Sequence, residues 1–394
     1  MRAYAAMEAL QKEMTGWRQD LHAHPEFGFE ERRTASLIAT KLREFGLDDV
    51  AEGVGGTGVV GTLRRGIGNR AIALRADMDA LRINEQGTPS YRSQTPGLMH
   101  ACGHDGHTAM LLGAAKMLAA EGGFDGVVRF IFQPAEEWGR GAQAMLEGGL
   151  LSRFPFDEIY GLHNWPGLAV GSLATRPGPL MAAEDNFEIK LSGRSVHAAR
   201  PHQGRDALVA ACATVLSLQT LVSRVLDPTE TAVVSVTELL TDGTRNVLPG
   251  NVRILGDCRS FRPEISSEIE ASMRRIAEGV AGAHGCEVEL TYTREFVPLV
   301  NDPEATQTAL SVAKAVFGPE NVKADCAPIA ASEDFARFLA HAPGCFVFIG
   351  NGMESRPLHN PHFDFNDEAL VHGARFHVEL ARHRLPKPDT VQTH

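Results

Sequence analysis

The sequence predicts an α/β protein in which a larger α/β/α domain is interrupted by a smaller α+β domain. Three observations support this fold class. The chain has 394 residues, which is longer than most single hydrophobic cores. Its outer parts alternate helix-like stretches with short, nearly continuous apolar runs, as strands covered by helices on both faces require. Its middle section instead contains strands in which apolar and polar residues alternate.

The outer parts of the chain account for the larger domain. We expect helices at about residues 7–22, 32–45 and 108–120, the last with apolar residues at helical spacing. We expect strands at about residues 59–64, 71–76, 126–132, 158–162 and 345–350. Helices and strands that alternate along the chain in this way favour a sheet with helices on both faces.

The middle section predicts a separate fold. A half-buried strand that includes residues 187–191 is followed by a helix at about 205–225, strands at 231–238 and 252–258, a helix at 264–284 and a strand at 287–293. This order is the ferredoxin-like pattern. We therefore expect an inserted domain at 185–296 and a larger domain formed by 1–184 and 297–394, with a frayed tail over the last ten residues.

Composition argues against two classes of partner. The formal net charge is -11, whereas a nucleic-acid surface needs clustered Lys and Arg. No apolar run approaches the roughly 20 residues that span a bilayer, and the N-terminus shows no apolar core followed by a cleavage site. The six cysteines have no paired spacing, which favours a reducing compartment, so we expect a cytoplasmic protein.

The densest group of potential metal ligands is the segment His100–His107, which reads HACGHDGH. A thiolate and several imidazoles this close together can ligate a borderline metal such as zinc. We expect the segment to form a glycine-containing loop just before the helix at 108–120. Glu136 and Glu137 follow the strand at 126–132 directly, and the carboxyl ends of strands are where open α/β sheets bind ligands. One of these carboxylates could bind metal while the other faces a bound water.

Other strand ends carry further candidates. His163 follows the strand at 158–162, and His359 lies in a loop before a helix that Asn366 could cap. Either histidine alone could be purely structural, but several metal-type residues at strand ends of one domain indicate a shared site. Asp77 and Asp79 end another strand, where they could bind metal directly or orient a ligand.

Two motifs lie outside this set. His197 ends a strand of the insertion, where its imidazole could donate to a developing oxyanion or be an ordinary surface side chain. The segment Gly53–Gly58 matches the G-x-G-x-x-G pattern of dinucleotide sites. A strand-like stretch follows it instead of a helix, so we do not expect a nucleotide to bind there.

Taken together, these motifs resemble the M20 peptidase superfamily, in its amidohydrolase branch of hippurate hydrolases, bacterial N-acyl-amino-acid deacylases and plant auxin-conjugate hydrolases. The matching stretches are RQDLHAHPEFGFEE, LRADMDAL, MHACGHDGHTAMLLGAA, FQPAEE, GLHNWP, GRSVHAARPHQGRDA, NVLP and LHNPHFDF. The resemblance implies a zinc-exopeptidase-like catalytic domain with a mixed central sheet and two divalent metal ions, which could be Zn, Mn, Co or Ni. It also implies that the insertion is a lid through which a homodimer or homotetramer forms.

The same resemblance implies which residues bind the metals. Cys102 resembles the ligand that bridges both ions. His104 and His163 look like ligands of one ion, and Glu137 and His359 look like ligands of the other.

Roles in catalysis and substrate binding are implied as well. Glu136 resembles the general base, and His197 looks like the lid histidine that reaches the substrate carbonyl, often in the partner subunit's site. Asn246 and Arg259 are similar to residues that bind the substrate carboxylate. The usual His-x-Asp ligand motif of the wider superfamily appears here as Asp77-Met-Asp79, so we expect Asp77 and Asp79 to support the site without binding metal.

We therefore expect a metal-dependent amidohydrolase that cleaves the amide bond of hippurate-like or N-acetylated amino acids. Its products would be a carboxylic acid and a free amino acid. One alternative is a metallo-dipeptidase or aminopeptidase on the same fold, which would need a site for a free α-amine. A second is a catalytically silent binding protein, which the full ligand set together with Glu136 disfavours.

Overall fold

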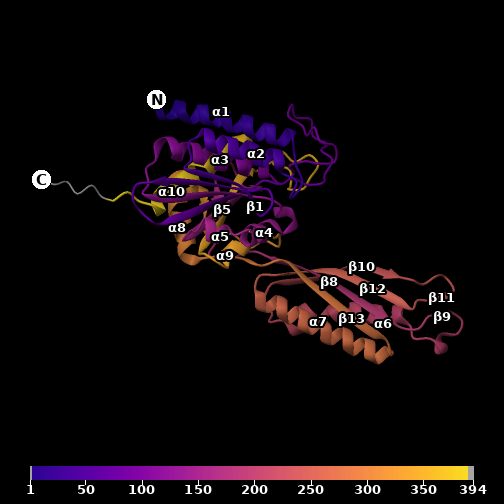
Figure 1. Cartoon of the computed structure of the whole chain (residues 1–394). Coiled ribbons are helices and arrows are strands. Elements are labelled where there is room, and N and C mark those ends of the chain that lie inside the picture. The colour runs from indigo at the N-terminus through magenta and orange to yellow at the C-terminus, as the bar shows by residue number, and fades with distance from the viewer. Residues whose placement is uncertain (1, 389–394) are drawn as a thin grey trace. The chain divides into compact units, whose positions relative to one another are not determined.

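The computed structural model describes residues 2–388, which form two compact units (Figure 1). Among the described residues, the first unit comprises 2–178, Asn301–Ala327 and 334–388, and the second comprises Pro179–Val300 and Pro328–Glu333. These limits differ by a few residues from the boundaries expected at 184/185 and 296/297, and the short segment 328–333 was not expected to join the insertion. Residues 389–394, part of the expected tail, lie outside the described residues.

A mixed sheet forms the centre of the first unit. Its strand order is β1-β2-β4-β3-β5-β16-β6-β15. The strands are β1 (Asp49–Val54), β2 (Gly58–Arg65), β3 (Ala71–Asp77), β4 (Gly126–Gln133), β5 (Glu158–Pro166), β6 (Leu173–Ala174), β15 (Val322–Lys323) and β16 (Gly344–Gly352). The neighbours β4, β3, β5 and β16 run parallel to one another, so their carboxyl ends lie at one edge. All seven residues of β3 are buried, as expected for a strand covered on both faces.

Helices cover both faces of this sheet. One face shares a single core with α1 (Arg2–Ala23), α2 (Arg32–Glu44), α3 (His104–Glu121), α8 (Pro303–Phe317) and α10 (Leu370–Arg384). The shorter α4 (Gly141–Glu147), α5 (Leu150–Arg153) and α9 (Ala336–Leu339) lie on the other face (Figure 1). No helix within residues 2–388 is long and apolar enough to cross a lipid bilayer.

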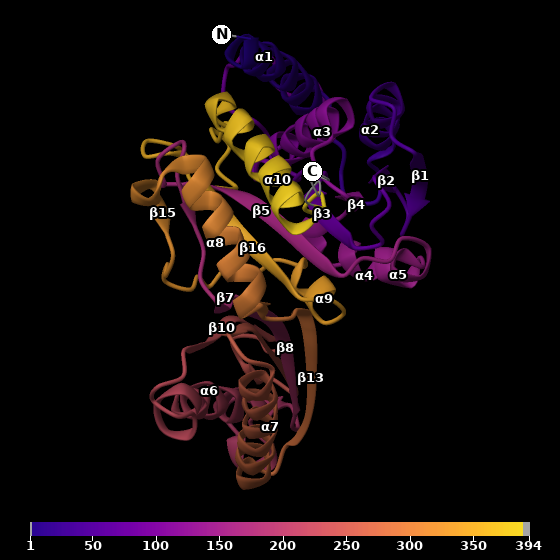
Figure 2. The ribbon, with the colours of Figure 1, turned by 90° about the vertical axis from the view of Figure 1, so that its left-hand side faces the viewer.

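The second unit is a four-stranded antiparallel sheet in the order β10-β12-β8-β13, packed against α6 and α7 (Figure 2). Its elements are β8 (Ala183–Ser192), α6 (Ala207–Leu218), β10 (Ala232–Thr241), β12 (Asn251–Ser260), α7 (Pro263–His284) and β13 (Glu287–Phe296). Buried and more exposed residues alternate along β8, as its sequence predicted. Chain order and sheet order together confirm the ferredoxin-like architecture.

Two predicted helices have different limits. The helix expected at 205–225 begins after Asp206, whose carboxylate caps it, and ends at Leu218 before a π-helical turn. The hydroxyl of Thr220 there donates to the carbonyl of Ser217 at 2.7 Å and so competes with regular helical bonding. The helix expected at 108–120 begins at His104, because polar residues buried in its first turn do not appear in an apolar periodicity. Part of the predicted metal-binding loop is therefore helical.

Candidate metal centre

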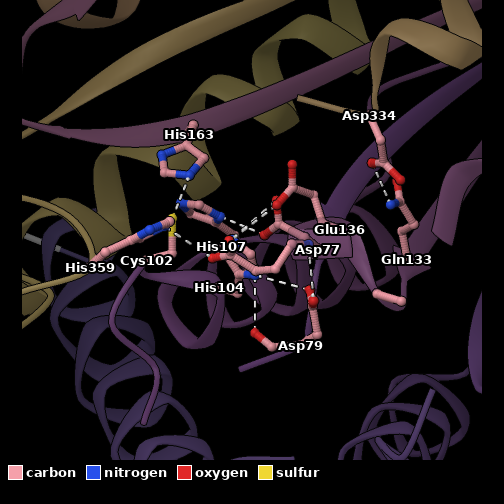
Figure 3. Close-up of polar contacts among 12 residues, drawn as sticks. Asp77, Asp79, Cys102, His104, His107, Gln133, Glu136, His163, Asp334 and His359 are labelled. Atoms are coloured by element: carbon pink, nitrogen blue, oxygen red, sulfur yellow. Dashed lines mark hydrogen bonds and ion pairs between the residues drawn. The ribbon is translucent and has the colours of Figure 1, made fainter. Parts of the chain in front are cut away.

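Neighbouring strand ends bring the predicted site residues together at one edge of the first unit's sheet (Figure 3). β3 ends at Asp77, β4 leads into a 3-10 turn at Glu136–Trp138, and β5 carries His163. His104 is the first residue of α3. Because the carboxyl ends of parallel strands meet at one edge, side chains far apart in the sequence converge there.

Cys102 belongs to two groups of potential metal ligands. Its Sγ lies 3.3 Å from Nε2 of His163, and His104 completes this group. Cys102 also forms a group with Glu137 and His359, whose Oε1 and Nε2 atoms are 3.3 Å apart. In each group the ligand atoms lie within 4.8 Å of one another, close enough for one ion to contact all three. The structure thus brings together all five residues expected to bind metal.

The two histidines of the first group direct the same ring nitrogen toward the site. His104 donates from Nδ1 to Asp79, whose carbonyl oxygen is 3.0 Å away and whose Oδ1 is 3.1 Å away. His163 donates from Nδ1 to the carbonyl oxygen of Asn164 at 2.7 Å. In the neutral ring of each histidine, the lone pair is therefore on Nε2, as metal ligation requires. Among the described residues, Nε2 of His104 is buried without a hydrogen-bond partner, so the ligand set fits a metal ion.

The electrostatics of the site also favour a cation. Burial alone would lower the pKa of His104, but Asp77 and Asp79 raise it to about 10. Burial and the carboxylate of Glu137 raise the pKa of the Cys102 thiol well above its ordinary value. A thiolate in this position therefore requires a nearby positive charge, which a divalent ion would supply.

Asp77 is bound by two cationic or donor groups. It accepts hydrogen bonds from Nη1 of Arg75 at 2.8 Å and from Nδ1 of His107 at 2.6 Å. Its Oδ2 lies 3.9 Å from Nε2 of His104, and it is absent from both groups that contain Cys102. His107 was expected only as a member of the segment His100–His107, with no role of its own. Its position three residues after His104, on the same face of a helix, was the available signal.

His359 lies on the accessible side of the site. Its side chain is 53% exposed, whereas Cys102 is buried. Its φ of 62° is left-handed, which costs a residue other than glycine about 1 kcal/mol. A hydrogen bond from its main-chain N–H to the carbonyl of Ala101, 2.8 Å long, holds it beside Cys102. Farther along the loop, Asn366 accepts from the N–H of Glu368 and caps the next helical turn, as the sequence predicted.

A buried arginine ties the loop of His359 to the N-terminal helix. Arg18 donates from Nε to Asp367 at 2.7 Å and from Nη1 to Asp364 at 3.1 Å. Its guanidinium also lies 4.3 Å from the ring centre of Tyr91. Sequence reasoning missed this network because each partner is more than 70 residues away along the chain.

His22, one turn after Arg18, binds the beginning of α3. Its Nδ1 lies 2.9 Å from Oδ2 of Asp105, which follows His104. Its Nε2 lies 3.4 Å from Oε1 of Glu85. His22 and Asp105 are at most 2% exposed, and Glu85 is 5% exposed. The ion pairs among these three side chains are therefore well shielded from water.

The remaining predicted residues belong to the second unit. His197 is exposed in the short strand β9 (Val196–His197), which pairs with β11 (Val247–Leu248). The carbonyl of Asn246 accepts the N–H of Ala198 at 2.9 Å. Arg259 lies in β12 and pairs with Glu184 at 2.8 Å. The structure describes these residues within their own unit.

Comparison with known proteins gives concordant results. Residues 73–383 match peptidase family M20/M25/M40. The chain is 38% identical to a hippurate hydrolase of Campylobacter jejuni, over 94% of this chain and 96% of that protein. It is 38% identical to an N-acetylcysteine deacetylase of Bacillus subtilis, over 95% and 98%. A solved Bacillus subtilis structure, described as a dinuclear metal binding peptidase of family M20, matches with a TM-score of 0.86 at 33% identity, over 97% of this chain and 99% of that one.

We expect His22 to make the metal-free protein less stable as pH rises. Burial alone would lower the pKa of His22, but hydrogen bonds with Asp105 and Glu85 raise it to about 9. The folded state therefore holds this proton more tightly than the unfolded state, where the pKa is about 6.5. The resulting stability, up to about 3 kcal/mol, is fully present below pH 6.5 and is lost as pH rises through about 9.

Urea unfolding of the metal-free protein between pH 6 and pH 10 measures this dependence. His22→Gln should make the decrease smaller but not abolish it, because the raised pKa of His104 contributes a further decrease over the same range. His24→Gln is the matched control, because the ring of His24 is 36% exposed and its polar contacts are with Asp20. An identical pH dependence in His22→Gln and the wild type would contradict the prediction.

Proposed function

The chain belongs to peptidase family M20/M25/M40, and from this premise we propose that it is a metal-dependent amidohydrolase of N-acyl amino acids. The observation that carries the proposal is the pair of ligand groups that share Cys102, with Glu136 beside them. The similar proteins named hippurate hydrolase and N-acetylcysteine deacetylase support hippurate-like or N-acetylated substrates. The products would be a carboxylic acid and a free amino acid.

Two divalent ions are part of this proposal. His104 and His163 would hold one, Glu137 and His359 the other, and Cys102 would contact both. When bound, such ions lower the pKa of a water molecule and polarise a carbonyl group. A thiolate ligand favours Zn, Co, Ni or Mn over Mg or Ca. The similar structure described as dinuclear supports two ions per chain.

Glu136 would act as the general base. Its Oε2 lies 3.9 Å from Nε2 of His104, yet Glu136 is not a member of either group that contains Cys102. A carboxylate in this position can take a proton from the water that attacks the amide carbonyl. The same carboxyl group would then deliver the proton to the nitrogen of the leaving amine.

Residues of the second unit would bind the substrate. Nδ1 of His197 accepts the N–H of Ala199 at 3.1 Å, so a neutral ring carries its proton on Nε2 and can donate to a developing oxyanion. We propose Asn246 and Arg259 as ligands of the substrate carboxylate. Arg259 already binds a carboxylate, that of Glu184, which a substrate would replace. Asp77 and Asp79 would support the metal ligands.

We also propose that the second unit forms a homodimer, which could pair further into a tetramer. β10 is an edge strand, and its exposed side chains include Val233 and Leu240. Leu216 of α6 is 73% exposed beside a hollow of about 500 Å³ that Leu239 also lines. An apolar edge strand next to an apolar helix favours pairing with a second copy of the chain.

A cytoplasmic location is the last part of the proposal. None of the six cysteines forms a disulfide. Free thiols, several of them buried, suit a reducing compartment.

Hydrolysis assays test the proposed function directly. We expect kcat/KM for hippurate or N-acetyl amino acids to exceed that for unblocked dipeptides by at least about tenfold. A chelator should abolish turnover, and added metal should restore it. A preference for unblocked dipeptides would instead identify a metallo-dipeptidase or aminopeptidase. No turnover of any N-acyl amino acid by the metal-loaded protein would favour a silent binding protein.

Two substitutions should distinguish the proposed general base, Glu136, from a proposed metal ligand, Cys102. Glu136→Gln should retain two ions per chain and lower kcat by about 10²–10⁴-fold, because it removes the proton acceptor and no metal ligand. Cys102→Ala should retain fewer than two ions. Elemental analysis with kinetics measures both, and either near-normal turnover of Glu136→Gln or full metal content in Cys102→Ala would refute the corresponding role.

The oligomer can be tested on the exposed apolar surface. Leu216→Glu or Leu239→Glu should convert the dimer to a monomer, because each places a charge where apolar side chains would be buried. Light scattering gives the mass. Ile67→Glu is the control, since Ile67 is 90% exposed in the first unit. A monomeric wild type would contradict the proposal.

A further inference from the structure

The turn that carries Glu136 and Glu137 has an uncommon backbone. After β4 ends at Gln133, Pro134 offers no N–H, and Ala135 adopts a left-handed conformation with φ 47°. This conformation is unfavourable for a residue with a Cβ atom. It persists only where surrounding contacts hold it.

One of those contacts is the carboxyl group of Glu31. Its Oε1 accepts the main-chain N–H of Ala135 at 2.9 Å, and its Oε2 accepts the hydroxyl of Thr57 at 2.5 Å. Glu31 is completely buried. Burial raises its pKa to about 7, although the bond from Thr57 opposes the increase. A buried acid is costly unless it is hydrogen-bonded, so its bonds to the turn and to Thr57 explain its presence.

The residues just before Glu31 pack against the same turn. A Cβ on Gly28 would lie 3.0 Å from the Cβ of Ala135, so glycine allows the two chains to approach closely. The rings of Phe27 and Trp138 meet edge to face with centroids 4.6 Å apart. Segment 27–31 therefore contacts both ends of the turn.

The glycine-rich segment Gly53–Gly58 completes this arrangement. A Cβ on Gly55 would lie 2.4 Å from the main-chain nitrogen of Met145, so the segment passes directly against α4. In that position it presents Thr57 to Glu31. The glycines that resemble a dinucleotide motif are thus explained by close packing against α4 and by the position of Thr57.

We propose that Glu31 is a positioning residue that sets the direction in which Glu136 and Glu137 leave the turn. The proposal rests on the function proposed above, because it assigns Glu31 to the presentation of the general base. Asp79 acts on the opposite side of the turn, where its Oδ2 accepts the N–H of Glu137 at 3.1 Å. The carboxylates of Glu31 and Asp79 therefore bind the two main-chain N–H groups on either side of Glu136.

Kinetics of Glu31 variants test this role. Glu31→Ala removes the acceptor and should lower kcat by about 10–100-fold with little change in KM, because the base moves while the substrate contacts remain. Glu31→Gln should restore most of the activity, since its amide oxygen can accept the same N–H while the Thr57 hydroxyl turns to accept from the amide. Thr57→Val should give an intermediate loss. It also provides a milder variant if Glu31→Ala does not fold.

Glu26→Ala is the matched control. Glu26 immediately precedes segment 27–31 and accepts the N–H groups of Arg33 and Thr34 at 2.9 and 2.8 Å, at the beginning of α2. Its loss should lower the urea concentration at which half of the protein is unfolded, as the loss of a helix cap does, and leave kcat unchanged. Equal decreases of kcat in Glu26→Ala and Glu31→Ala would show a purely structural role and overturn the inference.

Hydrogen exchange gives a readout that does not depend on activity. In metal-free Glu31→Ala, the amides of residues 135–137 should exchange faster than in the wild type, while those of β3 stay protected. Unchanged exchange together with wild-type kcat would overturn the inference. If the wild type hydrolyses no N-acyl amino acid, the proposed function fails, but the exchange rates still decide whether Glu31 holds the turn.

Discussion

The arrangement of the metal centre depends most on one carboxylate, that of Asp79. Its Oδ1 and its carbonyl oxygen both accept from His104, a member of one ligand group. Its Oδ2 accepts the N–H of Glu137, a member of the other. Asp79 is 1% exposed, so water does not compete for these bonds. A single residue just after β3 thereby orients potential ligands from α3 and from the turn after β4 relative to each other.

Much of the fold and the site could be predicted from the sequence because the relevant signals are local. The strands are short apolar runs, and the alternation in β8 marks a strand with one buried face. The segment around Cys102 and the pair Glu136-Glu137 lie next to such strands, and the carboxyl ends of parallel strands share one edge. The family resemblance added what local patterns cannot supply, namely which of these residues would share one metal ion.

The parts that were missed depend on contacts between distant segments. Arg18, His22 and Glu31 are polar residues near the N-terminus, and a helical or turn pattern gives no reason to bury them. Their partners lie between 26 and 349 residues away along the chain. The early beginning of α3 at His104 has a related cause, since its first turn is polar yet buried between α1 and the strand ends. Whether a charged residue can be buried depends on partners from distant segments, and a single sequence does not show which segments meet.

The exposure of His359 has a consequence for the proposed metal centre. Cys102, His104 and His163 are buried, whereas the imidazole of His359 borders water and its loop is fastened next to Cys102 by one main-chain hydrogen bond. The residues that surround a metal site control its access to solvent, so an ion bound beside an exposed ligand is hydrated more easily than an enclosed one. Of the two proposed metal positions, the one between Glu137 and His359 would then be the one that an ion enters and leaves more readily.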